Sequence, residues 1–382
     1  MADDLEKLPD FDPNEVKVNE KDVEVKADAV SGYEPVQWKA YADKLEPGIL
    51  ESMKKIFRYQ HLTEVQNTII SRMPLEKDLL VRSKTGTGKT LAFLIPAIQR
   101  FTDYTKENNF DPRKYAKTRA GTLILSPTRE LASQIASEAR RILYSIGPGQ
   151  PKVQVLVGGD PKKIQQKLML RERNDIIVAT PGRLLDYLET DEFVPALLSN
   201  IRTLILDETD SLLDMGFRKE ISSILDLLKD TEKERLNMMF SATISREVKD
   251  LAAQTSPHGI EYVNTVRSTD LDVHQLVNQT YIVRPMVEHV KVLLSLINSE
   301  QLKNPVGKVI VFFNTTKQVQ LYTLMFRILR RLYSNPHFQQ FEIHSKKDQE
   351  VRSKVNKAFR SANVGSVLFT SDVSYLPISL QS

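Results

Sequence analysis

The chain has 382 residues, of which 41% are hydrophobic and 27% are charged, enough apolar material for two domains of ordinary size. It contains no cysteine, which excludes disulfides, thiolate catalysis and cysteine-ligated zinc and fits a reducing intracellular compartment. No uncharged apolar run reaches membrane-spanning length, so neither a transmembrane helix nor a membrane partner is expected.

The net charge of +4 is unevenly distributed along the chain. Residues 1–30 hold ten acids and four lysines, a net of −6, so the remainder carries about +10. A chain segment with this positive charge can bind a polyanionic partner. We predict that residues 1–32 are a disordered acidic leader. This start is neither a secretory signal nor an ordinary mitochondrial presequence, so the cytoplasm or nucleus is expected, with the mitochondrion left open.

Beyond Trp38 the pattern becomes helical over residues 45–59 and then alternates between short apolar runs and amphipathic stretches. Helices are predicted at, for example, Glu130–Leu143 and Lys162–Arg171. Strands are predicted at Leu79–Val81, Thr122–Leu125, Val153–Val157, Asp175–Ala179, Thr203–Leu206 and Leu236–Phe240. Strands that alternate with helices predict an α/β fold, a parallel sheet covered on both faces.

A polar stretch without periodicity follows, and a linker is predicted over residues 257–275. A second alternation of helices and strands starts at Val287. It consists of helix Val287–Asn298, strand Lys308–Phe313, helix Thr316–Leu332, strand Gln340–His344, helix Gln349–Phe359 and strand Ser366–Thr370. We therefore expect a first domain over residues 33–256 and a second, incomplete one over residues 276–382.

The strongest local motif reads SKTGTGKT and lies between the strand LLV and the apolar helix LAFLIPAIQ, the context that a phosphate-binding loop requires. Glycines let backbone N–H groups face phosphates, and the helix N-terminus adds a favourable dipole. Lys89 would contact the β- and γ-phosphates of ATP, and Thr90 would place a hydroxyl on Mg²⁺. The expected nucleotide contacts are Ser83, Lys84, Thr85, Gly86, Thr87, Gly88, Lys89 and Thr90.

The second motif, DETD, directly follows the strand TLIL. A carboxylate at the end of a parallel strand emerges where α/β sheets bind ligands. Asp207 is suited to hold Mg²⁺ through water, and Glu208 to act as general base on the attacking water. An acidic cluster alone is more often a loop or a helix start, and it is the pairing with the phosphate loop that favours catalysis.

The ordered motifs resemble those of the DEAD-box ATP-dependent RNA helicases of superfamily 2, from about Trp38 to Val373. The resemblance implies two tandem RecA-like domains. It also implies that Gln66 reads adenine, that Tyr59 stacks on it where the family usually has Phe, and that His61 adds a nucleotide contact. DETD would be motif II, with Thr209 in place of the usual Ala, and SAT would be motif III, in which Ser241 and Thr243 couple the ATP state to RNA binding through Asp210.

The remaining motifs resemble the family's contacts to the RNA backbone. Motif VIVFFNTT resembles motif IV, His344 with Gln349 and Arg352 resembles the segment after it, and TSDV resembles the start of motif V. The expected RNA contacts are Pro127, Thr128, Arg129, Gly158, Gly159, Thr180, Pro181, Gly182, Arg183, Asn314 and Thr370. Arginines beside small residues can hold phosphates without reading bases, so binding independent of sequence is expected.

Several of these residues also have simpler structural interpretations. Ser241 and Thr243 could cap a helix, although hydrogen bonds to Asp210 fit their position. The glycine pair could be a turn, a lone arginine a surface ion pair, and His344 a packing residue. After Val373 the family pattern breaks, so we expect a chain that is truncated within motif V and lacks the arginine fingers.

Three functions follow from these motifs. The first is an ATP-dependent RNA helicase that binds ATP-Mg²⁺ and unwinds short duplexes. The second is a non-catalytic ATP- and RNA-binding fragment, because the arginine fingers are missing. The third is a DNA helicase or translocase of the same superfamily. Protein partners, the RNA target and the oligomeric state do not follow from the sequence.

Overall fold

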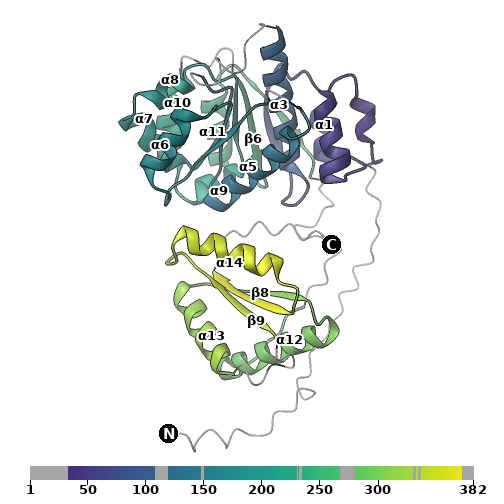
Figure 1. The fold of residues 1–382 in the computed structure, drawn as a ribbon, viewed down its shortest axis with the longest axis vertical. Coiled ribbons are helices and arrows are strands. Elements are labelled where there is room, and N and C mark those ends of the chain that lie inside the picture. Colours follow the sequence, from purple (N-terminus) through teal and green to yellow (C-terminus); the bar gives the residue numbers. More distant parts are fainter. Residues whose placement is uncertain are drawn as a thin grey trace, which may run out of the picture. The chain divides into compact units, whose positions relative to one another are not determined.

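The computed structural model describes residues 33–107, 119–147, 150–229, 231, 235–266, 280–329, 333 and 337–371. These residues form two compact units, a first over residues 33–266 and a second over residues 280–371, each with its own sheet. In Figure 1 the first unit runs from purple to teal and the second from green to yellow. The predicted acidic leader and the residues after Ser371 lie outside the described parts.

The first unit is built on a seven-stranded sheet whose strands run in parallel in the order β3-β4-β2-β5-β6-β1-β7. Its strands are β1 (Asp78–Arg82), β2 (Thr122–Leu125), β3 (Val153–Leu156), β4 (Ile176–Ala179), β5 (Thr203–Leu206), β6 (Leu236–Ser241) and β7 (Ile260–Asn264). The inner strands β2, β4, β5 and β6 are buried at every position, as expected for a sheet covered on both faces.

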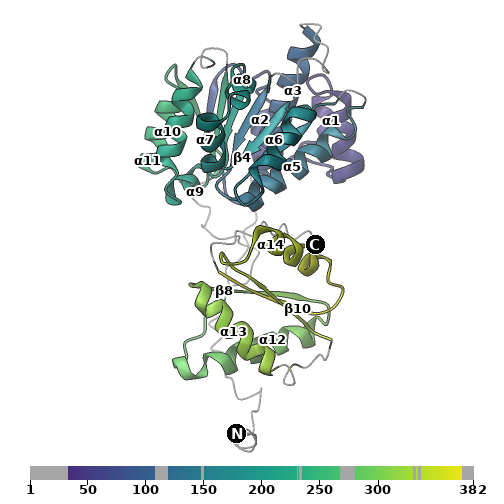
Figure 2. The ribbon, with the colours of Figure 1, turned by 60° about the vertical axis from the view of Figure 1, so that its left-hand side comes forward.

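Helices cover both faces of this sheet and give it two apolar cores (Figure 2). One core is formed with α1 (Pro47–Ser52), the π-turn Met53–Phe57, α2 (Glu64–Ile70), α3 (Lys89–Glu107) and α5 (Arg129–Leu143). The other is formed with α6 (Lys162–Arg171), α7 (Pro181–Thr190), α8 (Phe193–Leu198), α9 (Thr209–Asp214), α10 (Arg218–Leu227) and α11 (Arg246–Thr255). A 3-10 turn, Trp38–Tyr41, precedes α1.

Local sequence sets the starts of several helices. The Thr63 hydroxyl accepts from the Gln66 N–H while the Gln66 side chain accepts from the Thr63 N–H, a capping box that starts α2. The Thr128 hydroxyl accepts the Leu131 N–H at the start of α5, and the Ser245 hydroxyl accepts the Val248 N–H at the start of α11. Pro181 occupies the first turn of α7, where its missing N–H is no loss.

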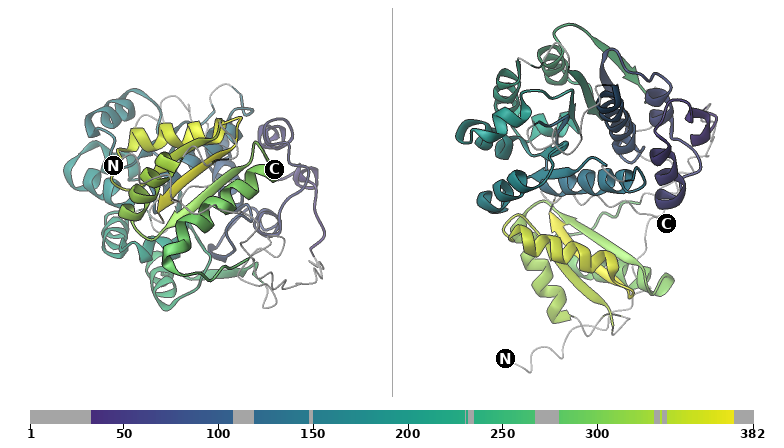
Figure 3. Two further views of the ribbon diagram at one scale, coloured as in Figure 1. Left: turned by 90° about the horizontal axis from the view of Figure 1, so that it is seen from below. Right: turned by 45° about the horizontal axis from the view of Figure 1, so that its top comes forward.

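The second unit contains a three-stranded parallel sheet in the order β8-β10-β9 (Figure 3). Its elements are the 3-10 turn Met286–Glu288, α12 (His289–Lys303), β8 (Lys308–Phe313), α13 (Thr316–Ile328), β9 (Gln339–Ile343), α14 (Gln349–Ser361) and β10 (Ser366–Ser371). Helices α12 and α13 pack on one face of the sheet and α14 on the other. The α/β fold class with parallel sheets is thereby confirmed.

The linker predicted over residues 257–275 is wrong in its first half, because β7 lies there and pairs with β1 from Asp78 to Arg82. As an edge strand, β7 buries only Val263 fully, so it lacks the apolar run that marked the other strands. The first unit therefore extends beyond residue 256. The helix predicted to end at Asn298 continues to Lys303. Its last turn is polar, so the apolar periodicity that marks a helix in the sequence does not extend that far.

Candidate functional site

Three motifs meet at one edge of the first sheet because of its strand order. The phosphate loop follows β1, the DETD motif follows β5, and SAT lies at the end of β6, which runs between β1 and β5. Since parallel strands all end at the same edge, the phosphate loop comes together there with two motifs that lie more than a hundred positions further along the chain. This is the candidate site.

The phosphate loop is held in shape by its own hydrogen bonds. Gly86 and Gly88 have φ values of 76° and 91°, a left-handed region that other residues rarely adopt. The Thr87 hydroxyl lies 2.7 Å from the Ser83 hydroxyl and 2.8 Å from the Lys84 carbonyl oxygen, to which it donates. The loop is thus preformed around space for an anion.

Lys89 and Thr90 begin α3 directly after this loop. Only 8% of Lys89 is exposed, and its ammonium donates to the Ser83 carbonyl oxygen at 3.3 Å, folding the side chain back over the loop. The helix N-terminus and this ammonium both favour a negative ligand. Thr85 and Gly86 are the exposed residues of the loop.

The acidic motif lies close enough to Lys89 for their charges to interact. Burial raises the pKa of Asp207 to about 7, because desolvation outweighs the attraction of Lys89, and the nearby Glu208 charge raises it further. The pKa of Glu208 is also raised, chiefly by burial. Glu208 has a left-handed backbone (φ 47°), the kind of local strain that clusters at functional sites.

The donor set fits a hard cation held mostly by water and phosphate. No group of three or more metal-ligating side chains occurs within the described ranges. One Glu208 oxygen, Oε2, is buried without a hydrogen-bond partner among those residues, while Asp207 Oδ1 accepts the Glu208 N–H at 3.0 Å. Mg²⁺ usually takes one or two carboxylates plus substrate oxygens and water, which matches this sparse set.

The raised pKa of Asp207 predicts a pH-dependent cost in stability. A carboxyl whose pKa is about 3.8 unfolded and about 7 folded destabilises the fold progressively as the pH rises through that window, reaching on the order of a few kcal/mol. Asp207→Asn should therefore raise the free energy of unfolding more at pH 8 than at pH 5, measured by urea denaturation without nucleotide. The exposed Asp226→Asn is the control. Equal gains at both pH values would contradict the interpretation.

Asp210 joins the acidic motif to SAT. Its Oδ2 accepts three hydrogen bonds, from the Ala242 N–H at 3.1 Å, the Thr243 N–H at 2.9 Å and the Thr243 hydroxyl at 3.1 Å. The expected contact from Ser241 is wrong: its hydroxyl donates to the Thr243 carbonyl oxygen at 2.7 Å and so stabilises the turn. Ser241 is fully buried in β6, which prevents it from reaching across.

The segment around Gln66 is fastened to the phosphate loop. The Gln66 side-chain nitrogen donates to the Gly88 carbonyl oxygen at 3.1 Å, and its oxygen accepts the Thr63 N–H at 3.0 Å. A Cβ on Gly88 would lie 2.4 Å from that nitrogen, so a larger residue would displace the Gln66 carboxamide, and the φ of 91° at this position also favours glycine. Thr63 was missed in the sequence, although the spacing T-x-x-Q is the signature of a capping box.

Tyr59 and His61 lie beside this segment. Tyr59 is 40% exposed, and its ring centroid is 5.7 Å from that of Phe57. His61 is exposed and forms an isolated bridge with Gln37. Arg58, directly before Tyr59, has a left-handed backbone (φ 59°) that ends the preceding helical turn and changes the chain direction. Of these three residues, Gln66 contacts the phosphate loop directly, and Tyr59 and His61 lie on the segment that leads into α2.

The predicted RNA contacts of the first unit form two groups. In the first, Thr128 caps α5 by accepting the Leu131 N–H at 3.2 Å, and Arg129 follows it. The Arg129 guanidinium lies over Gly158, where a Cβ would come within 3.0 Å of it, and Gly159 has a φ of 87°. Motif Ia and the glycine pair are therefore neighbours, with Pro127 at the end of β2.

The second group is Thr180, Pro181, Gly182 and Arg183 at the start of α7. The Arg183 guanidinium donates to the Asp160 carbonyl oxygen at 3.1 Å and to the Gln165 side-chain oxygen at 2.8 Å. Arg183 thus fixes the loop that follows the glycine pair. A Cβ on Gly182 would meet nothing within 4 Å, so this helix start is open.

The remaining predicted site residues belong to the second unit. Asn314 is exposed directly after β8, and Thr370 is buried near the end of the neighbouring β10. His344 is 3% exposed, its Nε2 lies 3.3 Å from Glu342 Oε1, and burial lowers its pKa, which supports a packing role. Asp372 and Val373 of the motif V resemblance lie outside the described residues.

Two family models match the chain. A DEAD/DEAH box helicase model matches residues 63–251, and a helicase conserved C-terminal domain model matches residues 288–381. Among the described helices, none has the length and apolar character needed to cross a bilayer.

Curated proteins and solved structures agree with these models. A rice (Oryza sativa subsp. japonica) protein named DEAD-box ATP-dependent RNA helicase 26 is 36% identical over 83% of this chain and 55% of its own length. An Aspergillus fumigatus protein named ATP-dependent RNA helicase mss116, mitochondrial, is 35% identical over 86% of this chain and 52% of its own length. The chain spans about half the length of these relatives.

A solved structure titled DEAD-box helicase Mss116 bound to ssRNA and UDP-BeF matches 88% of this chain and 66% of its own, with a TM-score of 0.77 and 26% identity. A DEAD box protein from Methanococcus jannaschii matches 88% of this chain and 81% of its own, with a TM-score of 0.51 and 25% identity. With the phosphate loop, DETD and SAT at one sheet edge, these similarities show that the chain belongs to the DEAD-box family of ATP-dependent RNA helicases.

Proposed function

We propose that this protein is an RNA-stimulated ATP hydrolase that remodels short RNA duplexes. The observation that carries the proposal is the set of three hydrogen bonds from the Ala242–Thr243 segment to Asp210. They connect the acidic motif beside the phosphate loop to the end of β6, so a change at the nucleotide can be transmitted along the sheet edge. Relatives named as RNA helicases, and related structures that hold ssRNA, point to RNA as the ligand.

Nucleotide binding rests on the phosphate loop. Its backbone N–H groups and the start of α3 receive the β- and γ-phosphates, and the Lys89 ammonium moves from the Ser83 carbonyl oxygen onto them. Gln66 and Tyr59 are the proposed contacts of the base, with His61 nearby. To read adenine, the Gln66 carboxamide exchanges its bond to Gly88 for one to the base.

Hydrolysis is assigned to the acidic motif. Asp207 and Thr90 would hold Mg²⁺, which neutralises charge on the phosphate oxygens when bound. Glu208 holds the attacking water and accepts its proton, a role that its raised pKa favours because a stronger base is a better proton acceptor. Asp207 is buried and Glu208 is half-buried, which limits the access of competing solvent to the reaction.

RNA binding is assigned to the edge that carries Arg129 and the glycine pair, together with the open start of α7. Arg129 holds a backbone phosphate there, and Arg183 positions the loop beside it. The exposed Asn314 is the proposed contact of the second unit, whereas Thr370 is buried in β10 and is not accessible to RNA in this conformation. The domain division that we propose is a nucleotide-binding unit through β7 and a second unit from residue 280. An RNA substrate places the protein inside the cell, in the cytoplasm, nucleus or mitochondrion.

The test is ATP hydrolysis by the full chain with and without single-stranded RNA, with single-stranded DNA of equal length in parallel. Stimulation by RNA and not by DNA is expected. Hydrolysis that ignores both polymers would overturn the proposal, and equal stimulation by DNA would favour a DNA translocase. Binding of ATP and RNA without turnover would favour the non-catalytic fragment.

Thr243→Ala should separate binding from coupling. It removes one of three hydrogen bonds on Asp210 while both backbone bonds remain. We expect RNA stimulation of hydrolysis to fall roughly 5- to 150-fold, the range of ordinary coupling energies, with ATP affinity unchanged. The exposed Ser199→Ala, whose hydroxyl bonds only its own helix, is the control. A parallel loss of ATP affinity would show that Thr243 acts on binding instead.

A further inference from the structure

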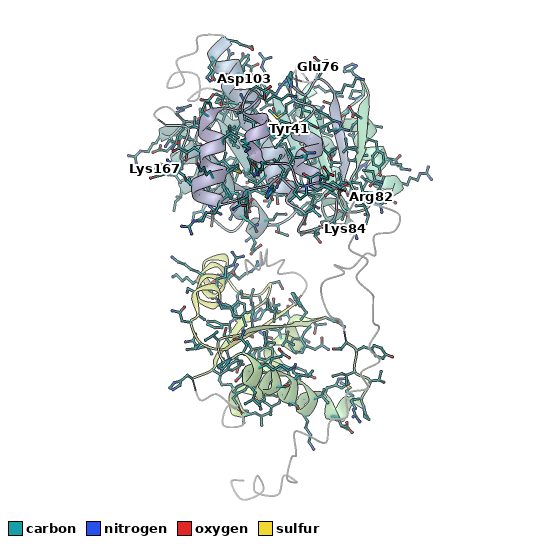
Figure 4. All side chains as sticks on the ribbon, turned by 90° about the vertical axis from the view of Figure 1, so that its right-hand side faces the viewer. Tyr41, Glu76, Arg82, Lys84, Asp103 and Lys167 are labelled. Carbon is teal, nitrogen blue, oxygen red and sulfur yellow. The ribbon has the colours of Figure 1, made fainter. Side chains whose placement is uncertain are left out.

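The segment that leads to the proposed base contact, Tyr59, packs against the second half of α5. The Ser52 hydroxyl, at the end of α1, donates to the Ile142 carbonyl oxygen at 2.6 Å, and both residues are buried. Figure 4 views the first unit from the side on which Tyr41 lies, with Lys84 of the phosphate loop at its lower edge. Helix α5 therefore supports the chain shortly before the residue that is proposed to meet the base.

Arg141, in the last turn of α5, makes two contacts to the turn Met53–Phe57 that precedes Tyr59. Its guanidinium donates to the Ile56 carbonyl oxygen at 3.2 Å and lies over the Phe57 ring, 4.1 Å from the ring centroid. One planar cation thus holds both the backbone and the aromatic ring of the turn. Since Arg141 is half-buried and Phe57 is 7% exposed, water has limited access to these contacts.

Phe57 passes this constraint on to Tyr59. The centroids of the two rings are 5.7 Å apart, and their planes are inclined by 37°. The Tyr59 N–H donates to the Met53 carbonyl oxygen at 3.0 Å, which closes the turn. Arg58 lies between the two aromatic residues with a φ of 59°, and a residue other than glycine stays in this region only where its neighbours hold it. The direction in which Tyr59 leaves the turn therefore depends on the contacts that fix Phe57.

We propose that Arg141 is a positioning residue for the base of ATP. It acts through Phe57, which holds the Tyr59 ring in the orientation for stacking on the base. Stacking of one base on an aromatic side chain changes affinity by about 5- to 150-fold, so the orientation of the ring has a measurable effect. The inference rests on the proposed function, because it takes Tyr59 as the base contact. It assigns Arg141 no part in binding the phosphates.

The test compares ATP with inorganic triphosphate, a ligand that has no base. Both affinities are measured with Mg²⁺ by displacement of a ribose-labelled ADP from the full chain. Arg141→Gln should weaken ATP binding ~10-fold, since it removes a charged hydrogen bond and a cation–π contact, and should leave the affinity for triphosphate unchanged. In steady-state hydrolysis this variant should raise KM for ATP and leave kcat unchanged, because stacking on the base is the same in the ground state and the transition state.

Three further variants separate positioning from packing. Arg141→Lys keeps a positive charge near the Phe57 ring and should restore part of the ATP affinity. Arg140→Gln removes the neighbouring arginine, which donates to the Val153 carbonyl oxygen at 2.9 Å, and should change neither affinity. Tyr59→Ala removes the ring through which Arg141 acts, so adding Arg141→Gln to it should weaken ATP binding no further. Thermal melting verifies that each variant is folded.

The outcomes distinguish this inference from the proposed function. If the unmodified chain binds neither ligand, the proposed function fails and the inference fails with it. If that chain binds ATP more tightly than triphosphate and Arg141→Gln leaves this preference intact, only the inference fails. Equal losses of both ligands in Arg141→Gln would mean a general distortion of the unit and would also overturn it. Additive losses of Arg141→Gln and Tyr59→Ala would show that Arg141 does not act through Tyr59.

Discussion

Replacing Lys89 by alanine is expected to abolish nucleotide binding at working ATP concentrations. Lys89 is 8% exposed, its ammonium donates to the Ser83 carbonyl oxygen of the phosphate loop, and its positive charge lowers the pKa values of Asp207 and Glu208. Its removal takes away the charge that would meet the β- and γ-phosphates and leaves Asp207 and Glu208 to repel them. Removing one preorganised donor to an oxyanion lowers kcat by about 10²–10³ in other enzymes, and we expect the affinity for ATP to fall by a factor of that order.

The measurement is the affinity of a fluorescent ATP analogue, followed by anisotropy with Mg²⁺ present. Lys229→Ala removes an exposed lysine paired with Asp226 and should leave the affinity unchanged. Thermal melting without nucleotide separates lost binding from lost folding. An affinity in Lys89→Ala equal to that of the unmodified chain would refute the assignment of the phosphate loop.

Replacing Glu208 by glutamine should give the opposite division of effects, with ATP binding kept and hydrolysis lost. Glutamine has nearly the same shape and retains an acceptor oxygen, but it cannot take a proton. General-base catalysis contributes typically ~10²–10⁴-fold, so the rate constant of hydrolysis should fall by about that factor. Glutamine and glutamate have similar backbone preferences, so the left-handed conformation at position 208 does not disfavour the exchange.

Single-turnover hydrolysis with ATP prebound isolates the chemical step from binding. Glu51→Gln, at an exposed position paired with Lys55, controls for the loss of a carboxylate elsewhere. Hydrolysis at an undiminished rate would remove Glu208 from the reaction. A fall in ATP affinity of the same size as the fall in rate would instead assign Glu208 to ligand binding.

The parts of the fold that the sequence predicted well are those with a strong local cause. The inner strands are continuous apolar runs, and strands Thr122–Leu125 and Thr203–Leu206 were predicted to the residue. The phosphate loop was recognised because glycines, lysine and flanking elements all lie within one short segment. Edge strand β7 was missed because a half-exposed strand carries little pattern.

Side-chain partners across the fold were harder to predict than elements. Position alone suggested that Ser241 would reach Asp210, but the register of β6 buries it and gives that role to the Ala242 and Thr243 amides. The hydrogen bond from Arg183 to the Asp160 carbonyl oxygen could not be predicted either, because Asp160 lies 23 residues away in the sequence.

The pairing of β7 with β1 couples the edge of the first sheet to the phosphate loop. Thr265, just past β7, donates its N–H at 3.0 Å and its hydroxyl at 3.1 Å to the carbonyl oxygen of Arg82, the residue before the phosphate loop. A displacement of β7 would therefore be transmitted first to the backbone beside Ser83. Within the first unit, the edge strand and the phosphate loop are thus mechanically coupled through the Arg82 carbonyl group.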